Sequence, residues 1–129
     1  MEGRKKVLVI DDEPDLVEMI RMALERQFEV ATAFNGQEGL AKARSDKPDA
    51  IVLDIMMPEK DGFTTCRELK EDPGTACIPV LILTGVGEHF GRTKYTRMSG
   101  MEIEADDYIA KPVDPNELLR RVAALLQRG

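Results

Sequence analysis

Residues 50–58 read Ala-Ile-Val-Leu-Asp-Ile-Met-Met-Pro, a short apolar run that carries one acidic residue, Asp54. A run of this length bounded by polar residues is typical of a strand buried on both faces. A second run, Val7-Leu-Val-Ile-Asp-Asp, has the same form and ends in Asp11 and Asp12. Ligands of an open parallel α/β sheet bind at the carboxyl ends of its strands. The two runs therefore predict three carboxylates that converge at one edge of a parallel sheet.

The rest of the chain alternates apolar runs with amphipathic stretches, which is typical of a parallel sheet covered by helices on both faces. Strands are predicted near residues 6–11, 28–33, 49–54, 79–84 and 106–109. The first helix begins at Pro14 and runs to about Gln27, with Leu16, Val17, Ile20, Met22 and Leu24 on its apolar side. A second follows Asn35-Gly36 to about Arg44, and a third opens at Asp61-Gly62 and stops before Pro73-Gly74.

The last helix has the clearest start signal. Asp114 is expected to cap it, Pro115 suits its first position, and Glu117 completes a capping-box-like arrangement. Its buried face is predicted to consist of Leu118, Leu119, Val122, Leu125 and Leu126. The glycine-containing segment 85–105 is expected to form a mobile loop followed by a short helix near 93–100.

Length and composition restrict the function further. A chain of 129 residues is one domain of ordinary size, and its formal charge of -6 argues against nonspecific binding to nucleic acid. The chain has no apolar run of the roughly 20 residues needed to span a bilayer, and its N-terminus leads straight into a strand. A cytoplasmic location is therefore expected. Cys66 and Cys77 form no C-x-x-C pair and are expected to be reduced, unpaired thiols.

Two more polar residues are predicted to join the carboxylates. Thr84 ends the fourth apolar run and Lys111 follows the fifth, so both should lie at the same edge of the sheet. Three converging carboxylates repel one another unless a cation is held between them, and oxygen ligands of this hardness suit Mg²⁺. A carboxylate that attacks a phosphoryl group needs that group's oxygens neutralised by metal, hydroxyl and ammonium. These residues therefore predict a Mg²⁺-dependent phosphoryl-transfer site.

The order of these signatures gives the chain a family resemblance. They are Asp11-Asp12, the run Asp54-x-x-x-Pro-x-x-Asp-Gly, Thr84, Ala105-Asp-Asp-Tyr and Lys111-Pro112. Together they resemble the receiver domains of two-component response regulators over nearly the whole chain. The resemblance implies one receiver domain over residues 1–129. It also implies a flavodoxin-like α/β fold, a doubly wound five-stranded parallel sheet in the order 2-1-3-4-5 between helical layers.

The resemblance also assigns roles to residues of this chain. Asp54 would accept the phosphoryl group and help to hold Mg²⁺. Asp12 would bind the metal directly, Asp11 largely through water, and Met56 through its backbone carbonyl. Such a protein is a signalling module that assists its own phosphorylation and dephosphorylation, and it is not counted as an enzyme.

Other implied roles concern the switch and the partners. Thr84 and Lys111 would contact the phosphoryl oxygens, and Tyr108 would turn inward as Thr84 moves toward the phosphate. The phosphoryl donor would be a histidine kinase or a histidine phosphotransfer protein. The output would pass to an effector protein or a fused output domain. A further option is a phosphorylation-dependent dimer through the helix near 93–100, the strand near 106–109 and the last helix. Direct binding to nucleic acid or membrane is not expected.

Alternative functions remain open at this point. A Mg²⁺-dependent phosphatase of the haloacid-dehalogenase type also forms an aspartyl-phosphate, but it places a second Asp two residues after the nucleophile, where this chain has Met56. A scaffolding receiver that is never phosphorylated usually lacks the acidic or lysine residues, which are all present here. A flavodoxin-like electron carrier needs a phosphate-binding loop and flavin-stacking aromatics, whereas this chain has no Trp and carboxylates at the end of its first strand. Taken alone, Asp11-Asp12 could also be a solvated turn or a helix cap, and Lys111 a surface lysine.

Overall fold

The computed structural model describes residues 4–54, 62–84 and 105–128. Within these ranges the elements follow one another as strands and helices of a repeated βα pattern. They are β1 (Lys6–Ile10), α1 (Pro14–Leu24), β2 (Glu29–Ala33), α2 (Gly36–Asp46), β3 (Ala50–Asp54), α3 (Gly62–Glu71), β4 (Val80–Thr84), β5 (Asp107–Ala110) and α5 (Pro115–Arg128). The predicted strands agree with these bounds to within one residue at each end. The predicted loop and short helix in segment 85–105 lie outside the described residues, except for Ala105.

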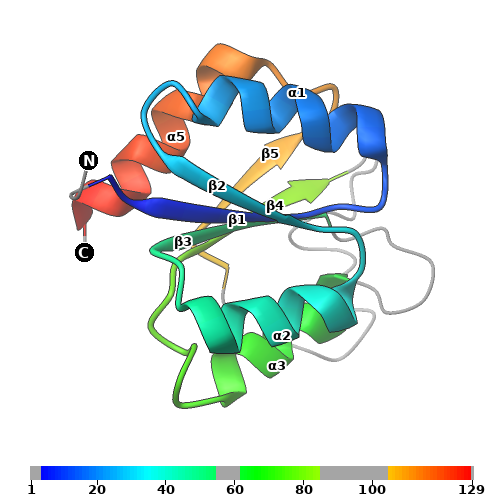
Figure 1. Ribbon diagram of the computed structural model, residues 1–129, viewed down its shortest axis with the longest axis vertical. Coiled ribbons are helices and arrows are strands. Elements are labelled where there is room, and N and C mark those ends of the chain that lie inside the picture. Colours follow the sequence, from blue (N-terminus) through cyan, green and yellow to red (C-terminus); the bar gives the residue numbers. More distant parts are fainter. Residues whose placement is uncertain (1–3, 55–61, 85–104, 129) are drawn as a thin grey trace.

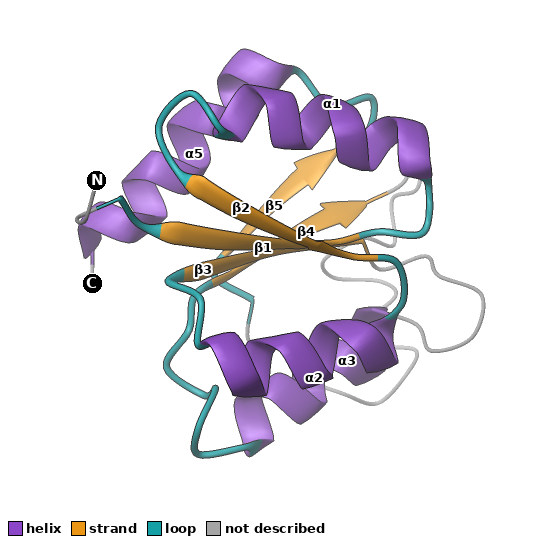
Figure 2. Cartoon of the chain, in the orientation of Figure 1, coloured by secondary structure: helices purple, strands orange, loops and turns teal. Residues whose placement is uncertain are grey.

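The five strands form one parallel sheet in the order β2-β1-β3-β4-β5 (Figure 2). The predicted fold class and strand order are therefore confirmed. Because β1 lies between β2 and β3, the chain changes direction across the sheet after its second strand. In a doubly wound sheet this reversal opens a crevice at the carboxyl ends of the strands beside it, here β1 and β3. Asp11 and Asp12 follow β1, and Asp54 is the last residue of β3.

Helices cover both faces of the sheet (Figure 1). α1 and α5 pack on one face, and α2 and α3 pack on the other. Side chains of β1 alternate between the two cores, since Leu8 and Ile10 face α2 and α3 whereas Val7 and Val9 face α1 and α5. Burial on both faces explains why the central strands read as continuous apolar runs rather than alternating ones.

Close packing of α2 on the sheet depends on a glycine. A Cβ atom placed on Gly39 would lie 2.4 Å from Cδ1 of Ile10, which is fully buried in β1. The helix starts immediately before this contact, where the Asn35 side chain accepts a hydrogen bond from the backbone N–H of Glu38. The predicted turn at Asn35-Gly36 is thus a helix cap, and α2 runs two residues beyond the predicted end at Arg44.

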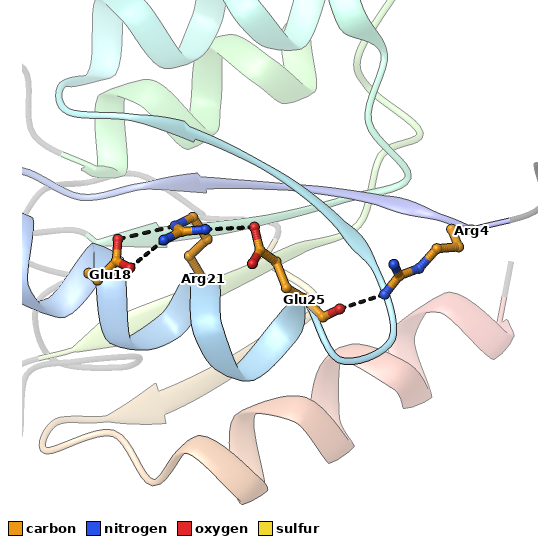
Figure 3. Close-up of polar contacts among 4 residues, drawn as sticks. All are labelled: Arg4, Glu18, Arg21 and Glu25. Atoms are coloured by element: carbon orange, nitrogen blue, oxygen red, sulfur yellow. Dashed lines mark hydrogen bonds and ion pairs between the residues drawn. The ribbon is translucent and has the colours of Figure 1, made fainter. Parts of the chain in front are cut away.

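The first helix ends earlier than its sequence pattern predicts. α1 stops at Leu24 rather than Gln27, and the N–H groups of Gln27 and Phe28 both donate to the Leu24 carbonyl. The guanidinium of Arg4 donates to the carbonyl of Glu25 (Figure 3). It also donates to the carbonyl of Gln27. These bonds fold the chain back so that Phe28 becomes buried beneath the helix.

The prediction that Met22 lies on the buried side of α1 is wrong. Met22 is 61% exposed, whereas Val17, Ile20 and Leu24 are buried. At about 100° per residue, Met22 lies on the opposite side of the helix from Val17, so it cannot reach the sheet. The charged side of α1 carries Arg21, which pairs with Glu18 one turn before it and with Glu25 one turn after it (Figure 3).

The last helix begins at the predicted residue, but the predicted capping box is not formed. The Asp114 side chain accepts a hydrogen bond of 3.0 Å from the backbone N–H of Asn116, and Pro115 is the first helical residue. The Glu117 carboxylate lies 3.0 Å from Arg121 instead of completing the capping box. On the inner side of α5, Leu118, Val122 and Leu125 are buried, and Leu119 and Leu126 pack against the same core.

Candidate functional site

Three carboxylates meet where β1 and β3 end. One oxygen from each of Asp11, Asp12 and Asp54 lies within 4.8 Å of the others. Asp11 and Asp54 are almost fully buried, at 0% and 1% exposure, and Asp12 is half-buried. The predicted convergence of the three side chains is therefore confirmed. Their position follows from the parallel pairing of β1 with β3, which places Ile10 beside Leu53 and brings the following residues together.

The electrostatics of Asp11 indicate that this cluster fits a cation. Its Oδ1 accepts a 3.0 Å hydrogen bond from the backbone N–H of Glu13, but its buried Oδ2 has no hydrogen-bond partner among the described residues. Burial, joined by the nearby charge of Asp54, raises the pKa of Asp11 to about 7, although the Glu13 N–H and Lys111 act in the opposite direction. A hard divalent cation would supply the missing partner and offset the repulsion.

Lys111 supplies a positive charge beside Asp54. Its Nζ donates to Asp54 Oδ2 at 3.1 Å, and its side chain is 21% exposed. Burial alone would lower the pKa of Lys111. This effect is outweighed by the hydrogen bond to Asp54 and by the negative charges of Asp54, Asp11 and Glu13, so the pKa of Lys111 is raised. Lys111 thus remains protonated beside the buried carboxylate. The peptide bond that joins it to Pro112 is cis.

The structure places the two predicted switch residues on adjacent strands. Thr84 ends β4 opposite Ala110 of β5, and Tyr108 lies opposite Ile82, earlier in the same pair of strands. Tyr108 is half-buried and packs against the core beneath α2 and α3. The side chain of Thr84, and Met56 as a whole, lie outside the described residues, so their predicted contacts stay predictions.

A cavity of about 630 Å³ lies next to the acidic cluster, between the start of α1 and the segment after β5. Asp12 and Lys111 line one part of it, and apolar side chains such as Leu16 and Met19 line another. The carboxylate cluster therefore borders a recess with room for a small molecule or for a side chain of a partner.

One residue of the site was missed by the sequence reasoning. Glu13 lies at the N-cap of α1, and its Oε1 is 3.4 Å from Nζ of Lys111. The residue type was a signal in the sequence, because Ser, Thr, Asp and Asn are preferred at an N-cap position and Glu is not.

Comparison with known proteins agrees with this geometry. The model of the response regulator receiver domain family matches residues 7–123. The chain is a response regulator receiver domain. It therefore belongs to two-component signalling, and the predicted family membership is confirmed.

Individual relatives support the assignment of this receiver domain. The alkaline phosphatase synthesis transcriptional regulatory protein PhoP of Bacillus subtilis is 42% identical over 126 residues, which is 97% of this chain and 50% of that protein. The receiver domain thus spans about half the length of this relative. Among solved structures, the Francisella response regulator 1452 receiver domain has a TM-score of 0.81 at 32% identity, covering 97% of this chain and 98% of the other. The BeF3-activated DrrB receiver domain has a TM-score of 0.78 at 30% identity, covering 97% and 99%.

The described part of the receiver domain contains two cysteines. Cys66 is buried and Cys77 is exposed, and neither forms a disulfide bond, as predicted. No helix in residues 4–54, 62–84 or 105–128 has the length and apolar character that crossing a bilayer requires.

Proposed function

We propose that this receiver domain accepts a phosphoryl group on Asp54 from a phosphohistidine, in a reaction that requires Mg²⁺. The observation that carries the proposal is the setting of Asp54, whose buried carboxylate belongs to the acidic cluster and accepts a hydrogen bond from the Lys111 ammonium. In the reaction, a carboxylate oxygen of Asp54 forms a bond to phosphorus as the bond from phosphorus to the histidine nitrogen breaks. The donor would be a histidine kinase or a histidine phosphotransfer protein.

The acidic cluster would hold the metal for this reaction. Asp12, Asp54 and the backbone carbonyl of Met56 would bind Mg²⁺ directly, and Asp11 largely through water. When bound, Mg²⁺ supplies positive charge that offsets the charge on the phosphoryl oxygens. The buried, unpartnered Oδ2 of Asp11 supports this role, because a carboxylate oxygen excluded from water is costly without a cation or a proton.

Lys111 and Thr84 would contact the remaining phosphoryl oxygens. Lys111 already points to Asp54, so its ammonium needs only a short movement to reach a group attached to that carboxylate. The hydroxyl of Thr84 would follow the phosphate, and Tyr108 would turn inward into the space that Thr84 leaves. The adjacency of β4 and β5 supports this coupling.

The output of the proposed switch would be a changed surface formed by the helix predicted near residues 93–100, β5 and α5. That surface would bind an effector protein, a fused output domain, or a second copy of the chain in a phosphorylation-dependent dimer. We infer that residues 1–129 form one receiver domain that works in the cytoplasm, where kinases that use ATP produce phosphohistidine. The domain would act as a signalling module and not as an enzyme with an external substrate, nor would it bind nucleic acid or membrane directly.

The test is Mg²⁺-dependent labelling of Asp54 by acetyl phosphate, followed by mass spectrometry of the intact protein. We expect one phosphoryl group per chain with Mg²⁺ and none in EDTA. Asp54→Asn should abolish labelling. Asp12→Ala should also abolish it, so that adding Mg²⁺ no longer makes a difference. The matched control is Asp46→Asn at the exposed end of α2, which makes the same charge change far from the site. Full labelling of Asp54→Asn would refute the assignment of the phosphoacceptor.

A further inference from the structure

Glu13 occupies the N-cap of α1 without capping the helix through its side chain. Its backbone is extended there, with φ of -99° and ψ of 107°, and its carboxylate makes no hydrogen bond to the first turn. The backbone carbonyl of Glu13 accepts the first helical bond from Val17, and its N–H holds Asp11. The backbone of this residue therefore serves the helix and the acidic cluster, whereas its side chain is directed elsewhere.

The side chain of Glu13 reaches the ammonium of the site. Its Oε1 lies 3.4 Å from Lys111 Nζ, and Asp54 Oδ2 lies 3.1 Å from the same nitrogen. The two carboxylates differ in setting, because the side chain of Glu13 is 61% exposed and that of Asp54 only 2%. Lys111 is thus shared between a buried carboxylate in the site and an exposed carboxylate at its rim.

We propose that Glu13 is a positioning residue that competes with Asp54 for the Lys111 ammonium and thereby slows phosphorylation. This inference rests on the proposed function of Asp54. When a phosphoryl group arrives, Lys111 must turn to its oxygens, and the contact with Glu13 must weaken. Losing that contact costs free energy on the way to the phosphorylated state, so a chain without it becomes phosphorylated faster.

The expected size follows from the exposure of Glu13. Exposed ion pairs are weak in water, so removal of this one should raise the phosphorylation rate by about two- to fivefold. The side chain of aspartate is one methylene shorter and cannot reach the ammonium from the same backbone position. Asp is also a good N-cap residue whereas Gln is a poor one. A contact with Lys111 therefore predicts that Glu13→Asp and Glu13→Gln behave alike, whereas a role in starting the helix predicts that they differ.

The experiment measures the rate of phosphorylation by acetyl phosphate at saturating Mg²⁺ in the wild type, Glu13→Gln, Glu13→Asp and Asp15→Asn. Asp15 is the matched control, since it is an exposed carboxylate two residues away in the first turn of α1. We expect both Glu13 variants to react about two to five times faster and Asp15→Asn to react at the wild-type rate. In the metal-free proteins, NMR signals of the Lys111 side chain should shift in both Glu13 variants and not in Asp15→Asn.

The outcomes separate this inference from the proposed function. Labelling of the wild type with unchanged or slower rates in Glu13→Gln would overturn the role of Glu13 alone. A faster Glu13→Gln with a wild-type rate in Glu13→Asp would also overturn it, because the charge and not the contact would then control the rate. Absence of labelling in every protein would refute the proposed function, and the role of Glu13 with it.

Discussion

Replacing Asp11 by asparagine should stabilise the metal-free protein, and the gain should depend on pH. The carboxyl group of Asp11 is fully buried, and its pKa rises from 3.8 to about 7 on folding. The folded state therefore favours the protonated form. The stability that this group contributes is fully present below pH 3.8 and is lost as the pH rises toward 7. The amide of the asparagine side chain would keep the shape of the carboxyl group without a charge to bury.

The magnitude follows from the same two pKa values. A change from 3.8 to about 7 corresponds to a loss of about 4 kcal/mol of folding free energy once the group is ionised in both states. At pH 4.5 the loss is only about 1 kcal/mol, because the folded carboxyl group is still protonated there. The difference in unfolding free energy between Asp11→Asn and the wild type should therefore grow by about 3 kcal/mol in favour of the variant as the pH rises from 4.5 to 8.

The assay is urea unfolding of both proteins in EDTA, at several pH values across this range. Asp15→Asn provides the control, since a surface substitution should change the free energy of unfolding by no more than about 0.5 kcal/mol at either pH. A constant difference between Asp11→Asn and the wild type across the pH range would refute the reasoning. So would an Asp11→Asn protein that is less stable than the wild type at pH 8.

Three other substitutions or conditions test the packing, the helix cap and the metal. Gly39→Ala should lower the free energy of unfolding by about 1–3 kcal/mol because the new Cβ meets Ile10, and adding Ile10→Val should restore part of it in denaturant titrations. Asn35→Ala should cost about 1 kcal/mol by removing the cap of α2, whereas Asn35→Asp should not; equal losses would contradict the cap. At pH 7.5, Mg²⁺ at tenfold excess over its dissociation constant should stabilise the wild type by about 1.4 kcal/mol, and thermal shifts should show no such effect for Asp12→Ala.

Local patterns determined most of the fold. The run from Ala50 to Asp54 and the run from Val7 to Asp12 each predict a buried strand with carboxylates at its end, and both strands lie where they were predicted. Parallel strands deliver their carboxyl ends to one edge, so the meeting of the acidic side chains also follows from the sequence. The cap at Asp114 is equally local, because it needs only a short polar side chain before a proline and a helical pattern.

Tertiary packing determined which residues of α1 are buried and where the helix ends, because the periodic pattern was ambiguous on both points. Met22 belongs to an apolar stretch of α1, but only its angle around the helix axis relative to the sheet shows that it faces solvent. The helix also stops at Leu24, since burial of Phe28 and the bonds from Arg4 favour a turn over three more helical residues. Helix periodicity alone contains no information about these distant contacts.

Only the tertiary structure decided the charge state and the contacts of the site. Glu13 and Lys111 are 98 positions apart, and they meet because one follows β1 and the other follows β5 at the same edge of the sheet. The raised pKa of Asp11 likewise depends on burial by surrounding elements and on the nearby charge of Asp54. The sequence determined which chemical groups reach this edge, because strand position is local. Distances and desolvation depend on how all the strands and helices pack, and those quantities control the chemistry.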